Sequence, residues 1–369
     1  MPTTVQQDTD DRFNWETIIT TTDDFDLLLS RFTFFDDGTT RSEAFENGQL
    51  AALTLTDLGP AGAPSDVRPW ERIEITYDSD GNVEDRYELR DDGVQILKSY
   101  EAGVLRLQQQ VDFGPNGTTS DARSWERIET GFDDAGVISY KLQVNDNGVQ
   151  QFTEYEDGVR RTFAQIDEGP QGEVPDVKPW QSIEIQYNAL GEIELRYQVN
   201  DNGVQLITEY ENGVRRAYTQ IDEGPLGEVS DVKSWSRIET RYDADGLIEA
   251  KFQLNDDGTT YLTEYENGIR SFQIREDKDE AGNSTDTFDW DFIAFNYDQN
   301  GAVTSKETLY DDGDVTALLY EDGVRAFKYE LDGDNSQDWV SRETIYDAAG
   351  AVVEVNTYDF NIFDQDPGF

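Results

Sequence analysis

The chain of 369 residues contains no cysteine and no histidine. Without cysteine there can be no disulfide, no thiolate nucleophile and no cysteine-ligated zinc. Without histidine the chain lacks the side chain that titrates near neutral pH and most often serves as a general base. The sequence therefore excludes zinc-finger modules and several large classes of enzyme.

Basic residues are scarce, because 29 Lys and Arg stand against 79 Asp and Glu and leave a formal net charge of -50. Phosphate binding needs a basic surface, so neither nucleic acid nor an anionic membrane surface is expected as a partner. Self-repulsion on this scale opposes a compact state at low ionic strength. Salt relieves it by shortening the Debye length, from about 8 Å under physiological conditions to about 3 Å at 1 M.

Long apolar runs are also missing. No segment approaches the roughly 20 apolar residues of a membrane-spanning helix, so no membrane insertion is predicted. The first 14 residues lack both the basic region and the apolar region of a conventional signal peptide. Export would therefore need a different signal or a leader that has been removed.

A tandem repeat organises the chain, and its seven tryptophans show it most clearly. Five successive gaps between them are 55 residues and the last is 49, while three glycine series keep the same step. Self-similarity at a fixed period of this size is typical of repeat architectures. The predicted divisions are 1–14 (the fourth strand of a preceding repeat), 15–69, 70–124, 125–179, 180–234, 235–289 and 290–338 (repeats 1 to 6), and 339–369 (a partial seventh repeat).

The repeat that begins at Trp180 shows the pattern within one unit. Its first three segments each end at a glycine, which supplies the positive φ that a tight turn needs. Between the turns the residues alternate, with Leu195 and Tyr197 facing one way and Arg196 and Gln198 the other. A period of two predicts a β-strand with one buried face. Each unit is therefore expected to form four short antiparallel strands, followed by a longer loop.

Two all-β architectures accommodate such a repeat. The first is a curved or coiled single-layer sheet of tandem 55-residue repeats with an aromatic inner face. The second is a seven-bladed β-propeller, in which the middle strands of each blade are buried on both faces. Polar faces such as that of Glu84, Arg86 and Glu88 are strongly hydrophilic and favour the sheet.

The two ends of the chain match different parts of the repeat. Residues 3–8 align with residues 327–332 in the fourth strand of the sixth repeat, and the chain ends after the first two strands of a seventh. Such complementary half-repeats could close a ring, join copies into a fibre, or remain as free edges. The expected partner is thus a second copy of the chain, bound through the terminal half-repeats.

Several segments resemble known repeat families. ITYDSDGNVEDRYELRDDG (75–93) and TRYDADGLIEAKFQLNDDG (240–258) resemble the tyrosine–aspartate repeats of Rhs and YD shell proteins. TEYENGVRR (208–216) and LYEDGVRAF (319–327) are similar to MORN-type and YwqK-like hairpin repeats. The whole unit resembles repeats of large secreted proteins of marine alphaproteobacteria, which often lie beside calcium-binding nonapeptides.

The resemblance covers nearly the whole chain, but its motifs are turn residues that specify architecture better than function. It implies an extracellular or cell-surface protein, exported without a conventional N-terminal signal peptide. No GGxGxD nonapeptide occurs here, so the calcium role of that partner module does not carry over. No catalytic residue of these families maps onto the chain.

Two repeated side chains are candidates for ligand binding. The tryptophans could stack on a ligand or pack against the next unit, and their strict period favours packing; they are Trp70, Trp125, Trp180, Trp235 and Trp290. The arginines after the second turn could bind an anionic glycan, but pairing with neighbouring carboxylates is the favoured interpretation; they are Arg160, Arg215, Arg270 and Arg325.

One aspartate series supplies the candidate metal ligands. It comprises Asp57, Asp112, Asp167, Asp222, Asp277 and Asp332. Stacked in register, these residues would form a column of carboxylates, and calcium takes six to eight oxygen ligands. Since no segment matches an EF-hand loop, turn capping is the competing and favoured interpretation. No other cofactor is predicted.

Nearly every carboxylate is one copy in a series, whereas an enzyme needs a unique site with perturbed groups. No catalytic residue is therefore predicted. The favoured function is an extracellular structural protein, a self-assembling fibre, surface-layer or scaffold subunit. The alternative is a glycan-binding or adhesive, lectin-like repeat module with calcium dependence as an option, in which avidity multiplies a weak site.

Overall fold

The computed structural model describes residues 1–10, 12–57, 68–112, 123–167, 178–222, 233–277 and 287–359. These residues contain 27 β-strands, with four strands in each complete repeat, and the expected all-β repeat fold is confirmed. None of the described residues forms a helix long and apolar enough to cross a membrane. The chain forms two compact units, Met1–Gly191 and Glu192–Phe369.

The strands of the first unit are β1 Thr3–Gln7, β2 Trp15–Thr22, β3 Leu28–Phe35, β4 Thr39–Glu46, β5 Gln49–Asp57, β6 Trp70–Tyr77, β7 Val83–Arg90, β8 Val94–Glu101, β9 Val104–Asp112, β10 Trp125–Phe132, β11 Ile138–Asn145, β12 Val149–Glu156, β13 Val159–Asp167 and β14 Trp180–Tyr187. Those of the second unit are β15 Ile193–Asn200, β16 Val204–Glu211, β17 Val214–Asp222, β18 Trp235–Tyr242, β19 Ile248–Asn255, β20 Thr260–Glu266, β21 Ile269–Glu276, β22 Trp290–Tyr297, β23 Val303–Tyr310, β24 Val315–Glu321, β25 Val324–Leu331, β26 Ser341–Tyr346 and β27 Val352–Tyr358.

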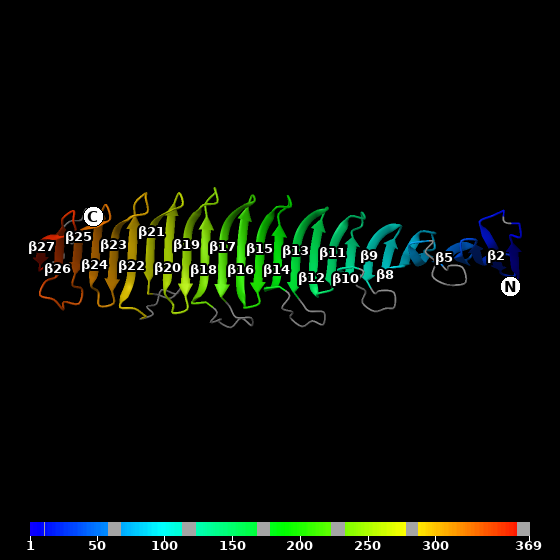
Figure 1. Ribbon diagram of the computed structural model, residues 1–369, viewed down its shortest axis with the longest axis horizontal. Helices are drawn as coiled ribbons and strands as arrows, with labels where there is room; N and C mark the ends of the chain where they lie inside the picture. The colour runs from blue at the N-terminus through cyan, green and yellow to red at the C-terminus, as the bar shows by residue number, and fades with distance from the viewer. Residues whose placement is uncertain are drawn as a thin grey trace. The chain divides into compact units, whose positions relative to one another are not determined.

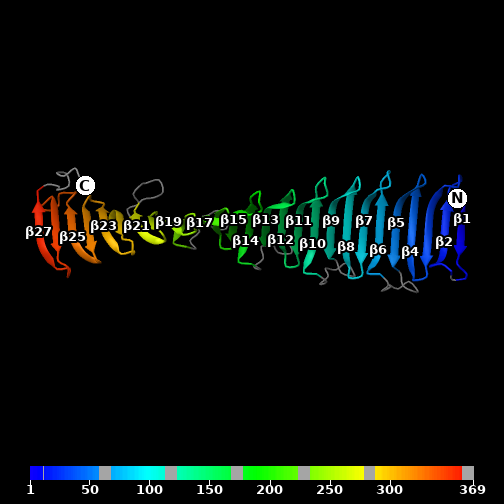
Figure 2. The ribbon, with the colours of Figure 1, turned by 90° about the horizontal axis from the view of Figure 1, so that it is seen from above.

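Within each unit, every strand pairs antiparallel with the next strand along the chain. Figure 2 shows the meander over β1–β13, and Figure 1 shows it over β15–β27. The pairing does not break between repeats, since β5 pairs with β6 and β17 with β18. The blades of a propeller are separate sheets, so this continuity favours the single sheet over the seven-bladed alternative.

Each unit is a single layer, and the expectation that each strand buries one face is wrong. In β15, Leu195 and Tyr197 on one face and Arg196 and Gln198 on the other are all half-buried. Each strand contacts mainly the strand before it and the strand after it. Side chains on both faces are therefore shielded chiefly by same-face neighbours on adjacent strands.

The most deeply buried side chains lie near the strand ends from which the long loops leave. Val94, Val149 and Val204 are only 2–4 % exposed, and each begins the third strand of its repeat. Val204 lies opposite Asp222 and shares a face with Thr208, which lies opposite Arg196. The small core thus forms on the face that the alternation of the sequence marks as polar.

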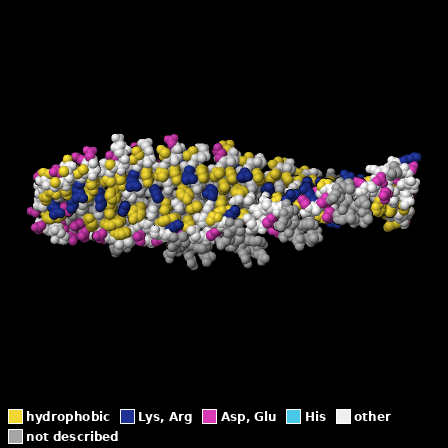
Figure 3. Space-filling model, viewed as in Figure 1, with side chains coloured by type: hydrophobic (Ala, Val, Ile, Leu, Met, Phe, Trp, Pro, Cys, Tyr) yellow, Lys and Arg dark blue, Asp and Glu magenta, His cyan; other side chains and the backbone are white. Residues whose placement is uncertain are grey.

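That face carries a basic residue at the centre of the second strand in every complete repeat. In the second unit Arg196 aligns through Thr208, Tyr218 and Thr240 with Lys251. The corresponding residues of the other repeats are Arg31, Arg86, Lys141 and Lys306. Over β15–β27, Figure 3 shows Lys and Arg in rows among hydrophobic side chains, with most Asp and Glu along the margins.

The turn between the third and fourth strands of each complete repeat has two residues, and both have positive φ. Asn212 (52°) and Gly213 (76°) show it between β16 and β17. Asparagine and aspartate tolerate this conformation better than other non-glycine residues. Ala102 is the exception, with a φ of 50° where the other complete repeats carry Asn or Asp.

We expect Ala102→Asn to stabilise the protein by about 0.5–1 kcal/mol, because asparagine relieves part of the left-handed strain. Urea unfolding of the variant measures the gain. As the matched control, Asn212→Ala should lower the free energy of unfolding by a similar amount. An unchanged or lower stability of Ala102→Asn would show that this turn carries no such strain.

Candidate functional site

The predicted calcium aspartates anchor the ends of the long loops. The six residues are 1–4 % exposed. In five of them Oδ2 accepts the backbone N–H of the residue eleven positions later, at 2.8–2.9 Å; the donors are Arg68, Arg123, Lys178, Lys233 and Phe288. In the sixth, the Oδ2 atom of Asp332 accepts from Gln337 at 2.9 Å. Each carboxylate is therefore hydrogen-bonded to the backbone two residues before the next tryptophan position.

One of these aspartates also lies beside other carboxylates. Ligand atoms of Asp314, Asp332 and Asp334 come within 4.8 Å of one another. Burial, together with the charges of neighbouring aspartates, raises the pKa of Asp314. Backbone N–H groups already donate to this cluster, from Gly333 to Asp314 Oδ1 and from Ser336 to Asp334 Oδ1. The geometry is thus that of a capped loop.

The predicted tryptophans begin the first strand of their repeats and are half-buried. Trp290 stacks on Phe288 with ring centroids 4.9 Å apart and planes 12° apart. Trp15 stacks on Phe13 at 5.4 Å in the same way. These two rings therefore pack on the aromatic residue two positions earlier, just before their own repeat begins, and all the rings keep part of their surface open to solvent.

The expectation that the turn arginines pair with carboxylates is wrong. They lie over tyrosine rings of the next first strand at 5.2–5.5 Å, and Nη1 donates to the tyrosine hydroxyl at 3.3–3.5 Å. In two of these four repeats the next residue is an arginine that pairs with a carboxylate instead, Arg161 with Glu156 at 2.8 Å and Arg216 with Glu211 at 2.9 Å. A ring shields the guanidinium from water and attracts it, whereas the exposed glutamate is within reach of the neighbouring side chain.

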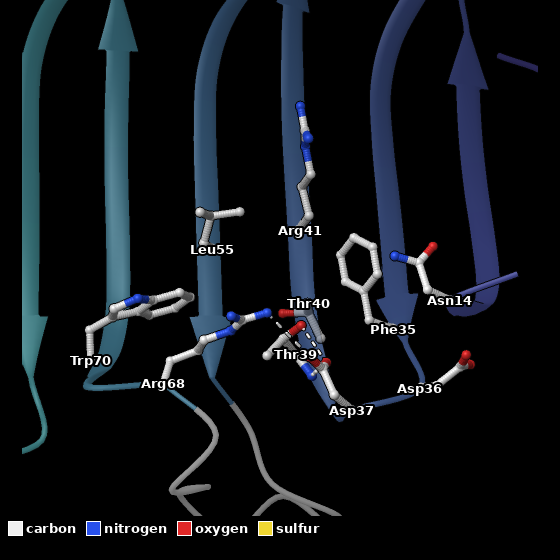
Figure 4. Close-up of a pocket in the computed structure, with 10 residues that line it drawn as sticks. All are labelled: Asn14, Phe35, Asp36, Asp37, Thr39, Thr40, Arg41, Leu55, Arg68 and Trp70. Atoms are coloured by element: carbon white, nitrogen blue, oxygen red, sulfur yellow. Dashed lines mark hydrogen bonds and ion pairs between the residues drawn. The ribbon is translucent and has the colours of Figure 1, made fainter.

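A hollow of about 450 Å³ lies in the first unit, over β3–β6. Phe35 borders it at one end and Trp70 at the other, with Arg41 and Leu55 between them (Figure 4). Arg41 and Leu55 are directly opposed on neighbouring strands and so share a face. The remaining lining residues are Asn14, Asp36, Asp37, Thr39, Thr40 and Arg68.

Three of the lining residues depart from the repeat. Where the first repeat has Phe35, Arg41 and Leu55, the third has Asn145, Gln151 and Gln165. The residues that recur in every repeat build the sheet. Residues that do not recur but line the same hollow therefore give the first repeat a feature that the other repeats lack. The period of the sequence does not point to these residues, because they do not repeat. The aromatic ring of Phe35 was a usable signal, since three of the five equivalent positions carry Asn.

The charges around the hollow are unevenly matched. The carboxylate of Glu43, 5 % exposed, faces two guanidinium groups, that of Arg41 at 2.6 Å and that of Arg31 at 3.6 Å. At the other side Arg68 lies 3.5 Å from Asp37. Hydrogen bonds from Thr39, with the nearby charge of Arg68, lower the pKa of Asp37. Glu43 and the two arginines that face it thus carry a net positive charge together.

No protein-family model matches the chain, and no curated protein matches it. Among solved structures, it is aligned with a 6-phosphogluconolactonase candidate from Bacteroides uniformis at 11% identity, over 96% of this chain and 98% of that one, with a TM-score of 0.15. It is also aligned with the Cps50 (Swd1) β-propeller domain of Myceliophteria thermophila at 10% identity, over 89% and 93%, with a TM-score of 0.14.

Proposed function

We propose that the chain is an extracellular structural repeat protein without catalytic activity, which assembles into a fibre, surface layer or scaffold through the outer strands of its sheet. The observation that carries this proposal is the edge at β27. Among the described residues, β27 pairs only with β26, and its Val352, Val353 and Val355 are 54–65 % exposed.

The first strand of the first unit is similarly exposed. β1 pairs with β2, and all five of its residues are exposed. An open edge presents unpaired N–H and C=O groups to any other strand, and natural proteins usually protect such edges with lysine, proline or a bulge. Neither β1 (TTVQQ) nor β27 (VVEVNTY) contains a lysine or a proline. The pairing of β27 shifts register between Val352 and Glu354, but from Glu354 to Tyr358 it is regular. Both edges therefore suit strand addition.

The strand types limit which edges can join in repeat register. β1 corresponds to the fourth strand of a repeat and β27 to the second. Joining β27 directly to β1 of another copy would therefore omit a third strand. Pairing of β27 with β27 avoids this mismatch of strand types and makes a two-fold symmetric contact, and a second such contact of β1 with β1 would extend the pair into a fibre.

The test replaces two edge valines by lysine, in the variant Val353→Lys/Val355→Lys. Light scattering and negative-stain microscopy should show concentration-dependent assembly of the unmodified chain. The variant should associate at least about tenfold more weakly, because two ammonium groups must be desolvated at the contact.

The control is Leu190→Lys, which removes an 81 % exposed hydrophobic side chain from a hairpin turn away from both edges. It should assemble like the unmodified chain. A chain that stays monomeric at every concentration, or a β27 variant that assembles normally, would contradict the proposal.

A further inference from the structure

We propose that the hollow between Phe35 and Trp70 binds a saccharide that carries a carboxylate group. This site is independent of assembly through β1 and β27. It differs from the repeated tryptophan positions because Phe35, Arg41 and Leu55 do not recur together in the other complete repeats.

The two aromatic walls are spaced for a ligand longer than a single small anion. Phe35 ends β3 and Trp70 begins β6, three strand spacings away, or about 14 Å at the usual separation of paired strands. Both side chains are half-buried and both border the hollow (Figure 4). Small-molecule sites commonly combine aromatic walls with a few placed polar groups, and the C–H face of a sugar ring is apolar enough to pack on such walls.

Arg41 supplies the charge that selects an acidic sugar. It lies between the walls, and its ion pair with Glu43 is shared with Arg31. Its Nε is buried and has no hydrogen-bond partner among the described residues, but the side chain as a whole is 42 % exposed and so within reach of a ligand. A ligand carboxylate would compensate the remaining positive charge of this trio through charge-assisted hydrogen bonds, for which the guanidinium geometry is well suited.

Polar groups beside the walls suit the hydroxyl groups of a sugar. Asp37 has a lowered pKa and stays ionised near neutral pH, so its carboxylate can accept hydrogen bonds from hydroxyls. Arg68, half-exposed beside it, can donate to them. A simple carboxylate such as acetate would satisfy Arg41 but would leave the aromatic walls and these groups unused.

Titration calorimetry with defined probes tests the assignment. The acidic probes are trigalacturonate and sialyllactose, the neutral probes are maltotriose and lactose, and acetate represents the carboxylate alone. We expect the chain to bind at least one acidic probe at least about tenfold more tightly than the neutral probes and acetate, which corresponds to one charge-assisted hydrogen bond.

The variants follow the repeat itself. Arg41→Gln and Phe35→Asn install the residues of the third repeat. Arg41→Gln should weaken the acidic probe by about tenfold to hundredfold and so abolish the preference over neutral sugars. Trp70→Ala should weaken the acidic and neutral probes alike, whereas Trp180→Ala, the same change at the tryptophan that follows the third repeat, should leave binding intact.

Three outcomes would overturn the proposal. The first is the absence of saturable heat with either acidic probe down to a Kd of about 10 mM. The second is equal affinity for acidic and neutral sugars, or for acetate. The third is an equal loss in Trp70→Ala and Trp180→Ala, which would indicate a site repeated in every unit. The Val353→Lys/Val355→Lys variant should bind as the unmodified chain does, so failure of one proposal is distinguishable from failure of the other.

Discussion

Asp222→Ala is expected to destabilise the chain by about 1–3 kcal/mol, because it removes a buried acceptor and leaves the Lys233 amide without its partner. The Oδ2 atom of Asp222 accepts this N–H at 2.8 Å, and the side chain is 2 % exposed. The contact joins the end of β17 to the residues just before β18. Loss of this hydrogen bond should therefore loosen the backbone at Lys233, just before β18.

Urea unfolding and amide hydrogen exchange measure the two consequences. The Lys233 amide should exchange faster in the variant, while amides in the centre of β18 should change less because stability in repeat arrays is largely local. Asp222→Asn, which keeps an oxygen acceptor, should lose less than the alanine variant.

Asp245→Ala provides the control, since Asp245 lies in an exposed turn and, among the described residues, hydrogen-bonds only through its backbone N–H. Its stability should stay within about 0.5 kcal/mol of the unmodified chain. Equal losses of unfolding free energy in the Asp222 and Asp245 variants would show that the Asp222–Lys233 hydrogen bond does not stabilise the chain.

The strands were predictable because their signals are local. Glycine and Asx residues mark each turn, and the alternation of Leu195, Arg196 and Tyr197 marks the strand between two turns. The identity of the next strand was also predictable, since a two-residue turn such as Asn212 and Gly213 brings consecutive strands together. These signals recur in every repeat and therefore reinforce one another.

Burial could not be predicted from alternation, because a single-layer sheet has no second layer to make one face the inside. Val204 and Thr208 are buried on the face that Arg196 marks as polar. Val204 is buried because it begins its strand at the end from which the long loops leave, and Thr208 is buried because neighbouring strands pack on both sides of it. Neither is a property of one strand read alone.

The candidate site shows a similar division. The aspartate series was predictable as a set, and capping was already the favoured interpretation, but the partner of each carboxylate lies across a loop, where neither strand alternation nor a tight turn specifies which residues meet. The hollow at Phe35 and Arg41 was hidden for the opposite reason. Periodicity selects the residues that repeat, whereas these residues stand out only by failing to do so.

Salt is expected to stabilise the chain strongly, which would be the second large effect. With 79 acidic and 29 basic side chains, fifty carboxylates have no countercharge within the chain. Two unit charges 10 Å apart in water repel by about 0.4 kcal/mol, so a few such pairs already amount to about 1 kcal/mol. Raising NaCl from 0.01 M to 0.1 M shortens the Debye length from about 30 Å to about 10 Å and screens these pairs.

The urea midpoint should therefore rise continuously with NaCl. A variant that removes three exposed charges, Asp80→Asn/Glu194→Gln/Asp245→Asn, should begin at a higher midpoint in low salt and rise less steeply. A midpoint that is flat or falls with NaCl would mean that the salt-sensitive ion pairs outweigh the repulsion.

Calcium chloride at matched ionic strength separates screening from specific binding. If the carboxylates act only through their summed charge, low calcium concentrations should add only a gradual shift without saturation. A saturable rise at low calcium that Asp332→Asn abolishes, and that Asp245→Asn leaves intact, would instead mean that the Asp314, Asp332 and Asp334 cluster holds an ion. The stability of this acidic sheet would then depend on a bound metal as well as on the ionic strength around it.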